Sequence, residues 1–302
     1  MTKITNLKGV YGPTLIPIKT NGEVDYQKMK QYYDYLINSK INGLMIFGSV
    51  GEFTSFSLEE RKKIADRALR IIDGRVPTIV NCTSTVFNEC KELAKEAVLS
   101  GADFISLLPP YYTLLSYDAL IKYIEEFCHS IDSPIILYNV PFSAKNEITP
   151  QMMYELVKEK KITNIVGIKD ASDNPFHLSH MLDICRKNKL AMFVAMEYVL
   201  LPMIILGASG SISPITNIVP NKMVELYESI KNKKYEKALD IYFKIILPLV
   251  DAVYYSKNFP AAIKEIMRLL GIDIGTVRKP LTPIDYQSLR IIKIKLKEAK
   301  LL

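Results

Sequence analysis

The sequence predicts a (β/α)8 TIM barrel that continues into a C-terminal helical extension. Eight apolar, strand-like segments alternate with segments of helical period over residues 1–222, and the connections between them are short. The chain of 302 residues is long enough for one such barrel and additional helices. An open, doubly wound sheet is the structural alternative, but it rarely contains so many uninterrupted strand–helix units.

Each predicted strand is a short run of aliphatic and β-branched residues bounded by polar or turn-forming residues. Continuous apolar runs of this kind are typical of parallel strands that are buried on both faces. In chain order, the predicted strands are 10–18, 43–48, 78–82, 103–108, 134–139, 165–170, 191–195 and 210–213.

The segments between the strands carry apolar residues at helical spacing, and residues that favour helix ends mark their boundaries. Ser57 and Glu60 have the spacing of a capping box. Pro150 occupies a first helical position after Thr149. In chain order, the predicted barrel helices are 25–40, a helix from 58, 86–100, a helix from 116, a helix from 150, 175–188, 200–206 and a helix from about 220.

Residues 223–302 form the predicted extension, because three segments of helical period follow one another there without a strand between them. No linker-like stretch separates them from the barrel, so we expect the extension to pack against it. We interpret Lys264 as a structural residue or one near the pocket entrance. The three segments are 235–257, 260–270 and 286–300.

Composition and charge exclude several classes of protein. A hydrophobic content of 49% supports a sizeable core, and 39 basic against 32 acidic residues give a formal net charge of +7. No basic segment has interleaved aromatics, so we expect no nucleic-acid partner. No apolar run reaches about 18 residues and the first residues lack the apolar core of a signal peptide, so we expect a soluble, cytoplasmic protein without a membrane partner.

Cysteines and histidines do not predict a metal site. The four cysteines lack a C-x-x-C spacing, which argues for a reducing compartment and against disulfides or zinc. His177 and His180 have helical i, i+3 spacing, but no third ligand is evident, so we interpret both as surface residues. The cysteines are Cys82, Cys90, Cys128 and Cys185.

The strand 165–170 ends in Lys169 and Asp170, and a lysine is unusual there. At the tip of a buried strand, it projects its amine into the pocket that the neighbouring strand ends enclose. Apolar walls disfavour the charged ammonium form, and a neutral amine is what Schiff-base formation with a carbonyl requires. The alternative is that Lys169 simply ends the strand and points to water.

The residues that follow each strand are the other candidates, since the active site of such a barrel lies at the carboxyl ends of its strands. Gly48 and Gly51 bracket a turn whose backbone N–H groups are able to bind a carboxylate. Tyr138 is a candidate for proton transfer, although a buried tyrosine is more often structural. The segments at the strand ends are 48–52, 109–112, 138–141, 169–170, 195–197 and 212–213.

Four of these segments carry the motifs G-S-V-G-E, P-Y-Y, Y-N-V-P and G-I-K-D, in this order. They resemble the family of pyruvate-dependent class I aldolases and lyases that includes dihydrodipicolinate synthase and N-acetylneuraminate lyase. The resemblance covers essentially the whole chain. It implies Schiff-base chemistry with pyruvate or a 2-keto acid, no metal, no cofactor, and a homotetramer built as a dimer of dimers.

The resemblance also implies a role for each matched residue. Lys169 matches the lysine that forms the Schiff base, and Tyr138 matches the tyrosine that shuttles protons. Ser49 matches a residue that helps to hold the pyruvate carboxylate and links Tyr138 to a second tyrosine. Tyr112 matches that second tyrosine, which the neighbouring subunit supplies in the family.

Four further residues are expected to contact substrate. Val50 stands where many family members have a second hydroxyl residue, so only its backbone N–H is left to contact the carboxylate. Ala195 and Ile212 match positions that provide backbone contacts and pocket walls. Glu197 is a candidate acceptor of hydrogen bonds from sugar hydroxyls.

Departures from the family motifs narrow the expected substrate. Dihydrodipicolinate synthase carries an arginine shortly after Y-N-V-P, whereas 142–144 is Phe-Ser-Ala here. N-acetylneuraminate lyases usually have a threonine at the position of Ala171. The chain looks most like the family's 2-keto-3-deoxygluconate aldolases, which produce pyruvate and glyceraldehyde. Relatives that accept the 6-phosphorylated sugar acid have an arginine and a tyrosine in the regions that 113–115 and Val140 occupy here. A phosphate group would lack these partners in this chain, so we expect the non-phosphorylated substrate.

Other functions on the same scaffold stay open at this point. The alternatives are dihydrodipicolinate synthase, N-acetylneuraminate lyase and a 2-keto-3-deoxy sugar acid dehydratase, and the non-enzymatic alternative is a sugar-acid binding protein. The aldehyde, the stereospecificity at C4, the choice between cleavage and dehydration, the direction of the reaction and the oligomer size are also open.

Overall fold

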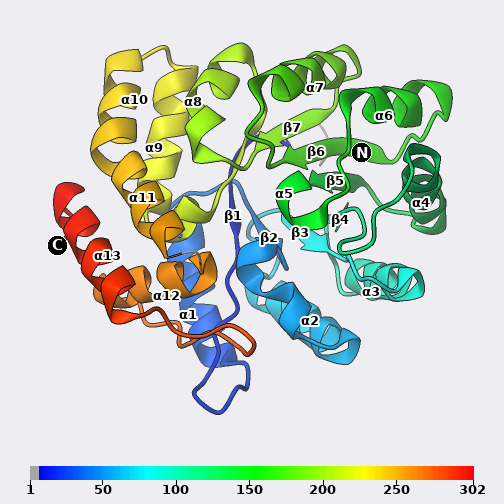
Figure 1. The fold of residues 1–302 in the computed structure, drawn as a ribbon. Helices are drawn as coiled ribbons and strands as arrows, with labels where there is room; N and C mark the ends of the chain where they lie inside the picture. The colour runs from blue at the N-terminus through cyan, green and yellow to red at the C-terminus, as the bar shows by residue number, and fades with distance from the viewer. Residues whose placement is uncertain (1–6, 257) are drawn as a thin grey trace.

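The computed structural model describes residues 7–256 and 258–302 and contains a closed parallel barrel (Figure 1). Each strand pairs with the next one along the chain, and β8 pairs with β1 to close the ring. Helices surround it, which confirms the (β/α)8 fold. The strands are β1 (Gly9–Pro13), β2 (Gly43–Ile46), β3 (Thr78–Asn81), β4 (Phe104–Leu107), β5 (Ile135–Asn139), β6 (Ile165–Asp170), β7 (Ala191–Val194) and β8 (Gly210–Ile212).

Seven of the eight barrel helices begin within one residue of the position that the sequence indicates, whereas the helix predicted from residue 200 begins at Glu197. The Ser57 hydroxyl accepts a hydrogen bond from the Glu60 N–H while the Glu60 carboxylate accepts one from the Ser57 N–H, which completes the capping box. The Thr149 hydroxyl caps the helix that Pro150 begins. The barrel helices are α1 (Tyr26–Asn38), α2 (Leu58–Ile72), α3 (Phe87–Leu99), α4 (Tyr117–Ser130), α6 (Pro150–Tyr154), α7 (Pro175–Lys187), α8 (Glu197–Leu206) and α9 (Pro220–Lys231).

Two features near the barrel differ from prediction. β1 ends at Pro13 rather than at residue 18, and Pro17 has no N–H with which to extend a strand ladder. A short helix, α5 (Pro141–Ala144), follows β5, because the fixed φ of Pro141 suits a first helical position.

The predicted helix 235–257 is divided in the structure. A π-helical turn (Tyr242–Ile246) separates α10 (Tyr235–Ile241) from α11 (Leu247–Tyr255). Pro248 has no N–H to donate to the carbonyl four residues earlier, which accounts for the irregular turn just before it. Residue 257 lies outside the described residues.

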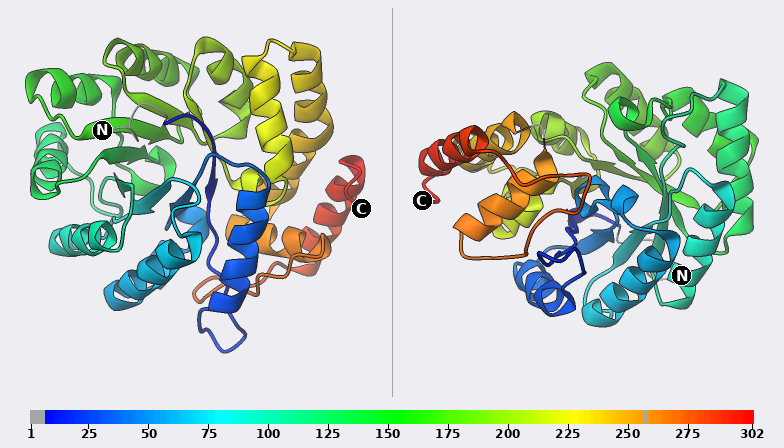
Figure 2. Two further views of the ribbon diagram at one scale, coloured as in Figure 1. Left: turned by 180° about the vertical axis from the view of Figure 1, so that it is seen from behind. Right: turned by 60° about the horizontal axis from the view of Figure 1, so that its bottom comes forward.

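The C-terminal helices lie on one side of the barrel, where α10 packs against α9 (Figure 2). Besides α10 and α11, they include α12 (Phe259–Leu269) and α13 (Tyr286–Glu298). α12 contacts the short 3-10 turn Ser49–Gly51 that follows β2. The division between residues 222 and 223 stays a prediction, and α9 runs across it. No helix within the described ranges is long and apolar enough to cross a membrane.

The barrel closes through a tight approach between β1 and β8. A Cβ atom added to Gly210 would overlap the carbonyl oxygen of Gly9 on the paired strand. Any side chain at residue 210 would therefore push the two strands apart, and glycine is required where backbones come this close.

Candidate active site

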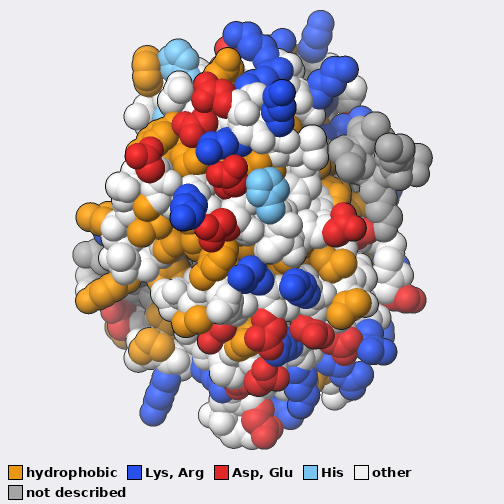
Figure 3. Space-filling view, turned by 90° about the vertical axis from the view of Figure 1, so that its right-hand side faces the viewer, with side chains coloured by type: hydrophobic (Ala, Val, Ile, Leu, Met, Phe, Trp, Pro, Cys, Tyr) orange, Lys and Arg blue, Asp and Glu red, His pale blue; other side chains and the backbone are white. Residues whose placement is uncertain are grey.

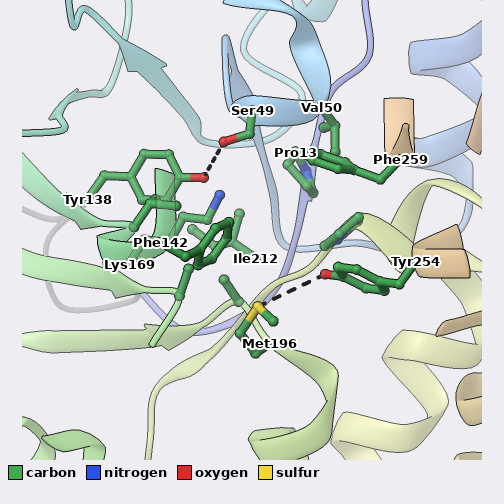
Figure 4. Close-up of a pocket in the computed structure, with 14 residues that line it drawn as sticks. Pro13, Ser49, Val50, Tyr138, Phe142, Lys169, Met196, Ile212, Tyr254 and Phe259 are labelled. Atoms are coloured by element: carbon green, nitrogen blue, oxygen red, sulfur yellow. Dashed lines mark hydrogen bonds between the residues drawn. The ribbon is translucent and has the colours of Figure 1, made fainter. Parts of the chain in front are cut away.

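Lys169 and Tyr138 lie side by side at the carboxyl ends of β6 and β5, where the strand register pairs them directly. The Lys169 side chain is only 3% exposed. Its Nζ lies 3.9 Å from the centroid of the Tyr138 ring and 3.6 Å from the Sδ of Met45. Within the described part of the chain, no carboxylate pairs with it. The amine thus faces the barrel mouth among weakly polar groups (Figure 4).

The Tyr138 hydroxyl is linked to Ser49, which begins the turn after β2. The two side-chain oxygens are 3.1 Å apart, and either hydroxyl is able to donate the hydrogen bond. Gly48, before the turn, is so near this amine that a Cβ added there would lie 3.8 Å from the Lys169 Nζ. A chain of two hydroxyl groups therefore runs beside the amine, which suits proton transfer at an atom bound to Lys169.

A cavity of about 60 Å³ adjoins these groups. Three of the four expected substrate contacts, Val50, Ala195 and Ile212, line it. Lys169 is the one basic residue among the described residues that line the cavity. A few polar groups in largely apolar walls are typical of a small-molecule site. Other wall residues, which the sequence analysis did not single out as substrate contacts, are Pro13, Phe142, Met196, Tyr254 and Phe259.

Glu197, the fourth expected substrate contact, is not among the residues that line the cavity. Its side chain is fully buried at the start of α8, and its Oε1 accepts a very short hydrogen bond from the Ser213 hydroxyl. Its Oε2 has no hydrogen-bond partner among the described residues. Burial raises the pKa of this carboxyl above its usual value.

Tyr112 is not brought to the site by its own chain. It is 93% exposed, lies outside the cavity lining and has a positive φ of 78°, which is strained for a tyrosine. One chain therefore brings together Lys169, Tyr138 and Ser49, whereas the Tyr112 of that chain lies outside their cavity.

Comparison with known proteins places this arrangement in a family. The model of the dihydrodipicolinate synthetase family matches residues 6–299 of the chain. The chain belongs to this family. Its members are pyruvate-dependent class I aldolases and lyases, and the chain is an enzyme of this type.

Relatives within the family support the same assignment. The 4-hydroxy-tetrahydrodipicolinate synthase of Methanococcus aeolicus is 31% identical over 296 residues, which cover 98% of this chain and 100% of the relative. That of Methanocaldococcus jannaschii is 31% identical over 295 residues, covering 98% and 99%. Both relatives bear the name of the dihydrodipicolinate synthase alternative rather than that of 2-keto-3-deoxygluconate aldolase.

Solved structures of the family superpose over almost the whole chain. A dihydrodipicolinate synthase matches with a TM-score of 0.90 and 30% identity, covering 98% of this chain and 100% of the other. YagE of Escherichia coli K12, solved in complex with pyruvate, matches with a TM-score of 0.92 and 29% identity, covering 98% and 99%. The helical extension is thus part of the shared fold.

The family motif G-S-V-G-E ends in a buried glutamate whose partner is not predictable from the motif. Glu52 forms an ion pair with Lys264 of α12, at 2.7 Å between Oε1 and Nζ. Glu52 also accepts a hydrogen bond from the Arg278 N–H. The apolar neighbours of Lys264 indicate in the sequence that it is buried, because Ile263 and Met267 put it on the buried face of its helix.

The family motif G-I-K-D ends in Asp170, whose partner is His177, and the interpretation of His177 as a surface residue is wrong. His177 is 5% exposed, and its Nε2 lies 2.8 Å from the Asp170 Oδ2. The fully buried Asp170 carboxylate requires donors, and α7 supplies one. Leu178 and Met181 indicate this buried face in the sequence.

Proposed function

We propose that the enzyme forms a Schiff base between Lys169 and the keto carbon of pyruvate or of a 2-keto acid. The observation that supports this most is the burial of the Lys169 Nζ beside the Tyr138 ring, with the hydroxyl pair of Tyr138 and Ser49 next to it. A neutral lysine amine attacks the carbonyl, and loss of water leaves a protonated imine.

The keto-acid carboxylate would lie against the turn after β2. Ser49 offers its hydroxyl and Val50 its backbone N–H. This N–H lies in the first turn of the 3-10 helix Ser49–Gly51 and so has no acceptor within it. Gly48 leaves room for the carboxylate near the amine. Lys169 Nζ and this turn then fix both ends of a pyruvate unit.

Carbon–carbon cleavage follows from the imine. The Tyr138 oxygen accepts the proton of the C4 hydroxyl while its own proton moves to Ser49. The electrons of the C3–C4 bond enter the imine and give an enamine, and the aldehyde leaves. Protonation of the enamine at C3 and hydrolysis by water release pyruvate and restore Lys169.

The substrate proposed first is a non-phosphorylated 2-keto-3-deoxy sugar acid such as 2-keto-3-deoxygluconate. Its aldehyde half, glyceraldehyde, carries no charge. This agrees with a cavity whose described lining residues include no cation besides Lys169, and with Phe142 where an arginine would hold a second carboxylate.

The second candidate is 4-hydroxy-tetrahydrodipicolinate synthase, which condenses pyruvate with an amino aldehyde acid through the same imine. The names of the relatives favour this candidate over the first. It requires another group to bind the second carboxylate, in place of the arginine that the segment 142–144 lacks.

Tyr112 completes the proposed site from a neighbouring subunit of a homotetramer, in agreement with its exposure and its absence from the cavity of its own chain. Its hydroxyl would continue the proton path from Ser49 toward solvent.

One experiment tests the Schiff base and a second tests the substrate. Borohydride reduction with pyruvate present should add a pyruvate-sized mass to Lys169, and Lys169→Ala should stay unmodified. Pyruvate release should then be assayed with 2-keto-3-deoxygluconate and its 6-phosphate, and ring formation with pyruvate and aspartate semialdehyde. Absence of trapping contradicts the proposed Schiff base at Lys169. Turnover of the sugar acid without release of pyruvate indicates dehydration. Ring formation that is faster than pyruvate release selects the second candidate.

A further inference from the structure

The residues next to the proposed catalytic pair form a second pair on the outer face of the same two strands. Tyr138 and Lys169 point into the barrel, so Asn139 and Asp170 point outward. The register pairs Asn139 with Asp170 as it pairs Tyr138 with Lys169, and the Asn139 Nδ2 donates to the Asp170 Oδ1 at 3.2 Å. The outer pair, Asn139 and Asp170, therefore holds together the strand ends that carry Tyr138 and Lys169.

Both oxygens of the Asp170 carboxylate have donors. Oδ1 also accepts from the Ser172 N–H at 2.9 Å, and Oδ2 lies 2.8 Å from the Nε2 of His177 on α7. Asn139 is fixed in turn, since its Oδ1 accepts from the Ile148 N–H at 3.0 Å. The network thus joins β5, β6, α7 and the segment before α6.

The second nitrogen of His177 faces another carboxylate. Its Nδ1 lies 3.1 Å from the Oε1 of Glu147, whose side chain is 42% exposed. An imidazole is able to donate to carboxylate oxygens from both nitrogens only when it is an imidazolium. Burial opposes this charge, but Asp170 and Glu147 outweigh it and raise the pKa of His177 above its ordinary value.

His177 and Glu147 also line a hollow of about 680 Å³ beside α6 and α7. The network therefore runs from the outer face of the proposed active site to a part of the surface that water reaches. Near this hollow, Asp183 and Lys187 form an ion pair with each other at 2.6 Å. Other titratable groups near His177 are Tyr154, Lys158 and His180 around the hollow and the buried Cys185 on α7.

We propose that His177 is a positioning residue, which as an imidazolium between Asp170 and Glu147 holds the outer pair of Asp170 and Asn139 and so keeps Lys169 beside Tyr138. The inference rests on the proposed role of Lys169. When the imidazolium loses a proton, one of its two carboxylates loses its donor. Turnover therefore declines as the pH rises through the pKa of His177.

The test is the dependence of kcat and KM on pH, from about pH 6 to about pH 9, in the full-length enzyme. Glu147→Gln removes an anion that stabilises the imidazolium, so the alkaline limb should move down by roughly half to one pH unit. His177→Gln keeps an N–H near Asp170 but does not titrate, so that limb should be absent. His177→Leu leaves Asp170 without this donor and should lower kcat about tenfold or more. His180→Gln, an exposed histidine on the same helix, should match wild type.

The outcomes separate this inference from the proposed function. Superimposable pH profiles for wild type, Glu147→Gln and His177→Gln overturn the inference, even where borohydride traps pyruvate on Lys169. Failure of trapping in wild type overturns the proposed function itself. If His177→Leu does not fold, the pH shift of Glu147→Gln carries the test, because Glu147 is half exposed and contacts neither Lys169 nor Tyr138.

Discussion

Lys264 of the C-terminal extension lies 2.7 Å from Glu52, which ends the turn that carries Ser49. The Lys264 Nζ also donates to the carbonyl oxygens of Ile16 at 2.8 Å and Thr276 at 2.6 Å, so all its hydrogens have acceptors. Glu52 adopts a left-handed φ of 52°, which a glutamate holds only when its surroundings fix it. The extension therefore fixes the Ser49 turn.

Lys264→Met should destabilise the enzyme more than removal of a surface pair. It leaves the Glu52 carboxylate buried without its cation, and breaking a buried pair in this way costs about 3–5 kcal/mol. The Ser49 turn should also move, so kcat/KM should fall in the fraction that stays folded. Urea unfolding and steady-state kinetics measure the two effects.

The matched control for Lys264→Met is Lys237→Met, which removes an exposed pair with Glu225 of the same 2.7 Å length. An exposed pair contributes at most about 1 kcal/mol. Equal losses of stability in the two variants would show that the buried pair does not hold the turn.

Alternating strands and helices made the barrel predictable, and the convergence of strand ends made Lys169, Tyr138 and Ser49 predictable as one site. Strand ends meet in any closed barrel, so that part of the geometry follows from topology alone. Tyr254 and Phe259 could not be predicted as wall residues, since they belong to helices whose packing on the barrel mouth has no local sequence signal.

The two buried ion pairs were missed for a different reason. Lys264 and Glu52 are 212 residues apart, and a lysine or histidine in a helix is usually exposed. In both helices the charged residue stands among apolar residues at helical spacing, which indicates burial and therefore a partner. Which residue serves as the partner depends on the tertiary fold.

Tyr138→Phe should separate imine formation from bond cleavage. Without the hydroxyl, no group is placed to take the C4 proton, and general acid–base catalysis contributes about 10²–10⁴-fold. We expect kcat to fall by that range while borohydride still traps some pyruvate on Lys169. Tyr254→Phe is the control, because Tyr254 lines the same cavity and has no bond to Ser49, and it should change kcat only slightly. Equal effects of the two would remove the role of Tyr138.

Glu197→Gln should change the pH dependence of stability. Burial raises the pKa of Glu197 above its unfolded value of 4.5, so the folded state binds the proton more tightly than the unfolded state. Wild type therefore loses stability as the pH rises from about 4.5 to the folded pKa. Glutamine imitates the protonated acid and has no charge to bury. In urea unfolding from about pH 4 to about pH 8, the stability of Glu197→Gln relative to wild type should increase with pH, and a constant difference would contradict the raised pKa.

The exposed position of Tyr112 leads to a test of sites shared between subunits. Lys169→Ala destroys the site of its own chain, whereas Tyr112→Phe, if Tyr112 acts in the neighbour, impairs the site of the partner. A hybrid dimer of the two variants then contains one site with neither defect, built from the lysine of one chain and the tyrosine of the other.

Co-expression of the two variants should therefore restore activity that neither has alone. Random pairing makes half of the dimers hybrid, each with one intact site of two, so about a quarter of the wild-type activity is expected. Hybrids isolated by two affinity tags should show this recovery, and Lys169→Ala paired with Lys169→Ala/Tyr112→Phe should not. If purified hybrids are no more active than the mean of the parent variants, Tyr112 does not act across the interface, and the proton path from Ser49 must end within one chain.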